Sequence, residues 1–150
     1  MHVSDLFRQV SDEWSTPQWL FDALHGEFGF TLDPCSSDVN VKCTRHFTVL
    51  DDGLSKDWGA ERVFMNPPYS ACEDWMRKAF DAASRGATVV CLMPSRTDTE
   101  WWHRYAMTGE IRFLKGRLKI GAANTVTAPF ASAIVIFRPP DFRLYHYDKT

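Results

Sequence analysis

Short apolar runs that alternate with amphipathic helical segments restrict the fold of this chain more than any other feature. Residues 62–65, 88–93 and 132–137 are buried-strand candidates, and residues 70–86 repeat apolar positions at helical spacing. Strands that are apolar throughout and separated by helices are typical of a mostly parallel sheet covered on both faces. We therefore predict an α/β, Rossmann-like domain in which helices flank a mostly parallel sheet.

The length of 150 residues fits one minimal domain. Within residues 1–150 we distinguish a polar N-terminal segment at residues 1–12 and a C-terminal extension at residues 138–150. Thr16-Pro17 is expected to begin a helix with Thr as its cap, and Ser70 with Glu73 forms a capping-box pattern for a second helix. Further expected elements are strands at residues 30–32 and 46–50, a helix capped by Thr97 or Asp98, and a strand or hairpin at residues 110–120.

The cysteines and histidines argue against a metal site. The four cysteines include no Cys-x-x-Cys pair, and the five histidines have no paired ligand spacing. Scattered thiols fit a reducing compartment, and no apolar run is long enough to span a bilayer. We therefore expect a cytoplasmic protein that binds neither metal nor membrane.

Two polar motifs follow predicted strands. Asp33-Pro34-Cys35 comes after residues 30–32, and Asn66-Pro67-Pro68-Tyr69 comes after residues 62–65. In open α/β sheets, ligands bind beyond the carboxyl ends of the strands. Both motifs are therefore candidates for a binding or catalytic site.

The residue types in Asn66-Pro67-Pro68-Tyr69 suit methyl transfer to an exocyclic amino group. The nitrogen lone pair of such a group is delocalised into its ring, and acceptors aimed at its two hydrogens favour the more tetrahedral, reactive geometry. The Asn66 side chain and the Pro67 carbonyl offer such acceptors, since the proline pair fixes the backbone. Tyr69 offers a flat face for a stacked base. A rigid turn after a strand is the plainer interpretation of Asn-Pro.

The chain resembles the phage DNA N6-adenine methyltransferase family over residues 13–137. Asn66-Pro67-Pro68-Tyr69 looks like the catalytic motif of amino-methyltransferases that act on adenine N6 or cytosine N4. The wider resemblance rests on several further motifs, namely Trp14-Ser15-Thr16-Pro17, residues 27–33, Asp52-Gly53-Leu54, Trp58, Pro94 with Arg96-Thr97-Asp98-Thr99, and residues 128–132.

This resemblance implies a class I methyltransferase fold with S-adenosylmethionine as the methyl donor. It implies that Asp33 binds the donor's amino group, although residues 33–37 lack the glycines of the family's Asp-Pro-Phe-x-Gly pattern. The residues that the resemblance assigns to cofactor binding are Trp14, Thr16, Pro17, Asp33, Pro34, Cys35, Ser36, Asp52 and Asn66.

Double-stranded DNA is the expected acceptor, with adenine extruded from the duplex. Residues 1–75 carry 13 acidic and 5 basic residues, whereas residues 76–150 carry 6 acidic and 12 basic ones. The basic half could face phosphates. Besides Tyr69, the candidate substrate residues are Arg96, Phe130, Arg112, Lys115, Arg117 and Lys119. Specificity would come from loops near residues 36–57 and 107–128 or from a homodimer, in a phage- or prophage-encoded enzyme.

Two alternatives remain open from the sequence. The same chemistry could serve cytosine N4, RNA guanine or protein glutamine. The chain could also be a catalytically silent binding domain, because its donor motif is poor in glycine.

Overall fold

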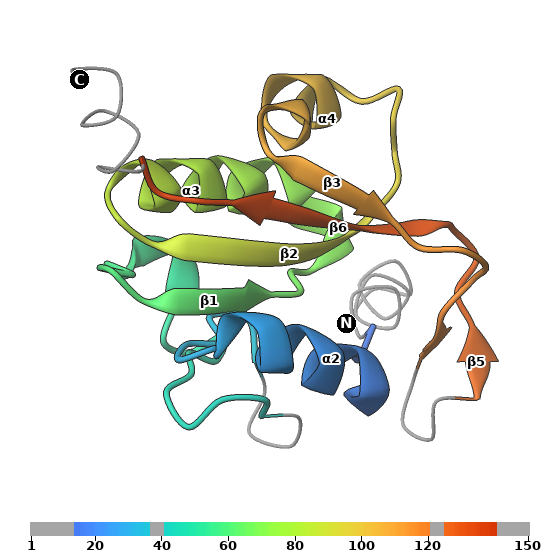
Figure 1. The fold of residues 1–150 in the computed structure, drawn as a ribbon, viewed down its shortest axis with the longest axis horizontal. Coiled ribbons are helices and arrows are strands. Elements are labelled where there is room, and N and C mark those ends of the chain that lie inside the picture. Colours follow the sequence, from blue (N-terminus) through green and yellow to red (C-terminus); the bar gives the residue numbers. More distant parts are fainter. Residues whose placement is uncertain (1–13, 37–40, 121–124, 141–150) are drawn as a thin grey trace, which may run out of the picture.

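The computed structural model describes residues 14–36, 41–120 and 125–140. A four-stranded sheet forms the centre, with α2 (Gln18–Phe28) on one face and α3 (Cys72–Ser84) and α4 (Glu100–Arg104) on the other (Figure 1). The strand order is β1-β2-β6-β3, with bounds β1 (Arg62–Met65), β2 (Thr88–Pro94), β6 (Ser132–Phe137) and β3 (Glu110–Phe113). The proposed segment 1–12 and most of the extension 138–150 lie outside the described residues.

The expectation of a mostly parallel sheet is wrong, because the sheet is mixed. β1 pairs with β2 in parallel, but β6 pairs antiparallel with both β2 and β3. A short antiparallel hairpin, β4 (Lys119–Ile120) with β5 (Val126–Thr127), connects β3 to β6 and projects from one end of the sheet (Figure 1). β6 therefore runs opposite to its two neighbours in the sheet. The sequence did not predict this, because an apolar run indicates a buried strand but not its direction.

Alternating side chains bury both faces of the central strands. In β2, Val89, Cys91 and Met93 belong to the core beneath α3 and α4. Val90 and Leu92 point the other way and join the core formed with α2. Both faces are buried because successive side chains of a strand point to opposite sides, which explains why these runs are apolar at every position.

The predicted strands at residues 62–65, 88–93 and 132–137 are confirmed, but the expected helix caps are wrong. α2 begins after Pro17, and Thr16 makes no capping bond. A 3₁₀ turn, η2 (Tyr69–Ala71), precedes α3, and the N-cap position of α3 is Ala71, one residue after the expected Ser70. Thr99 caps α4 by accepting a hydrogen bond from the Trp102 backbone, where Thr97 or Asp98 was expected.

The two short strands expected before β1 are reduced to single bridges. Leu32 bridges Val63, and Asp33 bridges His46, both in parallel orientation. Two further 3₁₀ turns are present, η1 (Gly53–Ser55) and η3 (Ala106–Thr108). Among the described residues, no helix has the length and apolar character needed to cross a membrane.

Gly53 is the point at which η1 approaches the Asp33-Pro34 segment. A Cβ atom on Gly53 would lie 2.4 Å from the Pro34 carbonyl oxygen and 3.1 Å from the Trp75 ring. The Trp58 indole also donates a hydrogen bond to the Gly53 carbonyl at 3.0 Å. The absence of a side chain therefore allows the loop that carries Asp52 to lie against the strand-end motif.

We predict that Gly53→Ala lowers the free energy of unfolding by about 1–3 kcal/mol, because backbone must move to accommodate the methyl group. Gly26→Ala is the matched control: a Cβ there meets nothing within 4 Å. Because Gly26 lies inside α2, alanine should instead stabilise the protein by about 0.5–1 kcal/mol. Urea denaturation measures both changes, and equal stabilities of the two variants would contradict the close approach.

Candidate active site

Three polar residues follow chain segments that point in the same direction. Asn66 follows β1 and Ser95 follows β2, and these strands are parallel. Asp33 follows Leu32, which bridges β1 in parallel on its other side. The carboxyl ends of parallel strands meet at one edge of a sheet. The structure thus brings Asn66 and Asp33, which the sequence placed separately at strand ends, to a common edge.

The Asn66 side chain is held through its nitrogen, and its oxygen has no hydrogen-bond partner among the residues that the structure describes. Nδ2 donates to the Trp14 carbonyl at 2.6 Å and to Thr16 Oγ1 at 2.9 Å. Oδ1 is shielded from solvent, yet it accepts no hydrogen bond within the described part of the chain. Buried polar atoms are nearly always paired, and an unpaired one points to a functional role.

An aromatic wall lies beside Asn66. The Phe130 ring contacts the Trp14 ring edge-on at 5.5 Å between centroids and the Tyr69 ring at 5.4 Å. Tyr69 is buried, and its hydroxyl donates to the Leu92 carbonyl at 3.1 Å. Burial raises the pKa of Tyr69. A base stacked on Tyr69 would therefore share or replace the contact that Phe130 makes.

Pro67 and Pro68 give this turn its shape. Pro67 is buried, and Pro68 is extended, with φ −64° and ψ 125°. The Pro68 carbonyl accepts from the Ala71 amide at 3.0 Å and so begins η2. The two prolines thus carry the chain from the end of β1 into η2, which leads into α3.

Asp33 is a buried carboxyl group at the same edge. It is 5% exposed, and its Oδ1 accepts from the Cys35 backbone at 3.1 Å. Burial raises the pKa of Asp33 to about 6, although the Cys35 hydrogen bond and the charges of His46 and Lys42 oppose the change. A perturbed carboxyl group in such a position is typical of a binding site.

The residues around Asp33 have mainly structural hydrogen bonds. Ser36 donates both its backbone amide, at 3.0 Å, and its hydroxyl, at 3.2 Å, to the Phe47 carbonyl. Pro34 is buried under Gly53. Asp52 is exposed and adopts the left-handed conformation with φ 56°. Asp52 thus precedes Gly53, the residue that lies against Pro34.

The candidate substrate residues divide into two groups. Arg96 lies close to the site: its guanidinium approaches the Tyr69 carbonyl at 3.4 Å, and it lines a hollow of about 310 Å³ with Glu73 and Trp101. Lys115 and Arg117 are exposed in the turn before β4, and Lys119 on β4 donates to Thr127 at 2.6 Å. Lys119 thus belongs to the hairpin itself, and Lys115 and Arg117 lie in the segment that leads into it.

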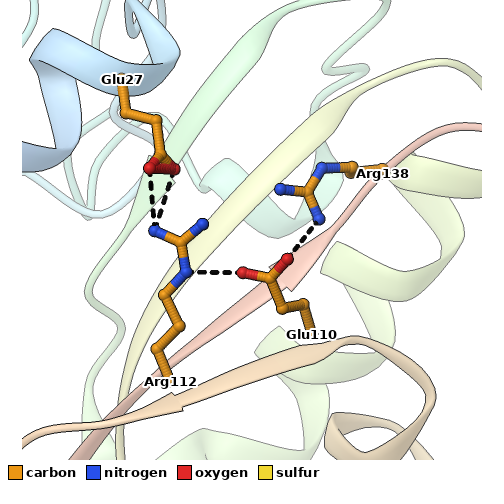
Figure 2. Close-up of polar contacts among 4 residues, drawn as sticks. All are labelled: Glu27, Glu110, Arg112 and Arg138. Carbon is orange, nitrogen blue, oxygen red and sulfur yellow. Dashed lines mark hydrogen bonds and ion pairs between the residues drawn. The ribbon is translucent and has the colours of Figure 1, made fainter.

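Arg112 belongs to neither of these two groups of basic residues. Figure 2 shows its guanidinium between Glu27 of α2, at 2.9 Å, and Glu110 of β3, which also binds Arg138 at 3.0 Å. The network joins the end of α2 to the edge strand, and both glutamates balance the arginine charges. The Arg112 guanidinium is therefore paired with carboxylates of the protein itself, and the structure does not bring it to Asn66.

Sequence reasoning missed Ser95. Its backbone amide donates to the Ala131 carbonyl at 2.9 Å, beside Phe130, while its buried Oγ has no partner among the described residues. The available signal was its position directly after the apolar run of β2, which corresponds to the position of Asn66 after β1. No group of three or more potential metal ligands occurs among the described residues.

Comparison of the sequence with known proteins identifies the family of this chain. A family model described as DNA N-6-adenine-methyltransferase (Dam) matches residues 3–142. The chain is 30% identical over 95 residues to the DNA N-6-adenine-methyltransferase of Escherichia phage T1, a match that covers 62% of this chain and 40% of the relative. It is 30% identical over 105 residues to the protein of that name from Haemophilus phage HP1, covering 68% of this chain and 61% of the relative.

A third relative is the putative methyltransferase YfdM of Escherichia coli, which is 37% identical over 70 residues. That match covers 41% of this chain and 76% of the relative. The chain thus spans less than two thirds of the two phage relatives but is matched by the family model over nearly its whole length. On that match, this chain belongs to the DNA N-6-adenine-methyltransferase (Dam) family.

Proposed function

We propose that this chain transfers the methyl group of S-adenosylmethionine to the N6 amine of adenine in double-stranded DNA, in the cytoplasm of a bacterial cell. The family and the names of the phage relatives support the reaction. The main structural observation behind the proposal is that Asn66 Oδ1 is shielded from solvent and has no hydrogen-bond partner among the described residues. An exocyclic amine offers the donor that this oxygen lacks.

The arrangement of the strands supports a Rossmann-like class I methyltransferase fold. β1, β2 and β3 run in one direction, and β6 alone is reversed between β2 and β3 in the four-stranded sheet. The site then occupies the edge at which ligands bind in α/β sheets.

S-adenosylmethionine supplies an electrophilic methyl group on a positively charged sulfur. The residues present fit this donor: the buried Asp33 carboxylate suits its ammonium group, and Asp52, one loop away, suits ribose hydroxyls. Trp14 and Pro17, from the segment before α2, would cover the donor, and Pro34, Cys35 and Ser36 would line it with their backbone.

The chain's own groups would orient the amine. Asn66 Oδ1 and the Pro67 carbonyl would accept from its two hydrogens, which favours a tetrahedral nitrogen and the positive charge that develops on it. Tyr69 and Phe130 would hold the base, and positioning the nitrogen in line with the methyl group supplies much of the rate.

The base must leave the duplex to reach this edge. Extrusion costs a few kcal/mol, and contacts to the DNA backbone would offset that cost. Arg96, beside the Tyr69 turn, and the exposed Lys115, Arg117 and Lys119 near the hairpin are the basic residues available for such contacts.

We predict that Asn66→Ala lowers the methylation rate by about 100-fold or more, since it removes an acceptor used in the transition state. Labelled donor with separate DNA, RNA and protein acceptors measures the rate, and modification-sensitive sequencing identifies N6-methyladenine. Gln18→Ala is the matched control, because it removes an exposed amide and should retain full activity.

Three outcomes would contradict the proposal. Label in cytosine, RNA or protein instead of adenine would identify a different acceptor for the same chemistry. No binding of donor at millimolar concentration would indicate a silent binding domain. Unchanged activity of Asn66→Ala, with a thermal unfolding temperature like that of the parent protein, would remove Asn66 from the reaction.

Asp33 should make donor binding dependent on pH. Its pKa is raised to about 6 in the folded protein, so the carboxyl is neutral below this value and charged above it. Only the charged form pairs with an ammonium group. The dissociation constant for donor should therefore decrease by about tenfold as the pH rises from 5 to 7, as measured by calorimetry.

Two variants test the origin of this dependence. Asp33→Asn should bind donor weakly, with little change over the same range. Asp51→Asn should behave like the parent protein, because hydrogen bonds from Thr48 lower the pKa of Asp51 below its usual value and away from this range.

A further inference from the structure

Thr16 uses its hydroxyl in a way that its position before a helix does not explain. It directly precedes Pro17, the N-cap of α2, but makes no capping bond. It is 4% exposed, and its Oγ1 accepts instead from Asn66 Nδ2 at 2.9 Å, 50 residues away in the chain. A buried hydroxyl therefore connects the segment before α2 to the end of β1.

The orientation of the Asn66 amide depends on this connection. An asparagine amide has two orientations that exchange oxygen and nitrogen. The Trp14 carbonyl, 2.6 Å from Nδ2, can only accept a hydrogen bond, so it selects the orientation with nitrogen toward residues 14–16. The reversed amide would place two oxygens together and lose that bond.

The Trp14 carbonyl alone leaves the amide free to rotate about one contact. Thr16 Oγ1 provides the second point of attachment, because it accepts from the same Nδ2 group. With both hydrogens of Nδ2 engaged, the plane of the amide is determined and Oδ1 must point away from residues 14–16. This is the oxygen that has no partner among the described residues.

We propose that Thr16 is a positioning residue for amine methylation, because its hydroxyl holds the Asn66 amide with Oδ1 directed at the acceptor amine. The inference rests on the proposed function and assigns Thr16 a role through Asn66. A direct contact with the donor, by contrast, would affect donor affinity, whereas amide positioning affects the rate at saturating substrates.

The experiment compares Thr16→Val, which keeps the shape and loses the acceptor, with Thr16→Ser, which keeps the hydroxyl. Thr31→Val is the matched control: Thr31 Oγ1 accepts from the Arg62 amide at 2.9 Å, at the opposite end of β1. We expect kcat for DNA methylation to decrease by about five- to tenfold in Thr16→Val, the factor for one net hydrogen bond. The KM for DNA and the Kd for donor should change by less than about twofold.

Thr16→Ser should restore most of kcat, and Thr31→Val should leave kcat unchanged. The proposal is overturned if Thr16→Val retains the parent kcat, if Thr16→Ser is as slow as Thr16→Val, or if the loss appears only in the Kd for donor. The last result would make Thr16 a donor contact.

A second measurement needs no activity. Thermal unfolding of Thr16→Val, Asn66→Ala and the double variant forms a mutant cycle. We expect Thr16→Val to lower Tm in the parent protein and to have little further effect once Asn66 is alanine. Additive shifts would overturn the proposal even if DNA is methylated. If the shifts are non-additive but no acceptor is methylated, the contact between Thr16 and Asn66 is confirmed. The proposed function, and with it the positioning role, is then overturned.

Discussion

The parallel pairing of β1 is the constraint on which the site depends. β1 lies between Leu32 and β2, and all three segments run in the same direction. Asp33, Asn66 and Ser95 are therefore collected at one edge, although they are separated by tens of residues in the chain. The pairing is stable because the strands bury side chains on both faces, under α2 on one side and under α3 and α4 on the other.

The burial of polar groups at this edge costs stability. Asp33 is held where its charged form is disfavoured, and Asn66 Oδ1 and Ser95 Oγ are shielded without partners among the described residues. Such groups cost folding free energy unless a ligand satisfies them. A positively charged donor for Asp33 and an amine for Asn66 would each supply what is missing. In the proposed function, the donor would bind at Asp33 and the acceptor base beside the Tyr69 and Phe130 rings, which contact each other edge-on.

The charged residues illustrate where sequence reasoning was limited. Arg112 and Lys115 belong to the same basic run, but Arg112 is paired with Glu27 and Glu110 (Figure 2), whereas Lys115 is exposed. Glu27 lies 85 residues before Arg112, and no local pattern predicts that contact. The cap expected at Thr16 failed for a related reason: Thr16 matched a helix cap locally, but its hydroxyl binds the Asn66 side chain, which is distant in the sequence.

By itself, the sequence determined the buried strands, the helix between β1 and β2, and the two strand-end motifs, because apolar periodicity and proline act locally. The same residues also carried the family resemblance. Only the tertiary structure decided the reversed direction of β6, the link from Thr16 to Asn66, and the lack of a partner for Asn66 Oδ1 among the described residues. Each of these depends on which segments meet after the chain folds. Strand direction and hydrogen-bond partners are properties of pairs of segments, and neither member of a pair encodes them alone.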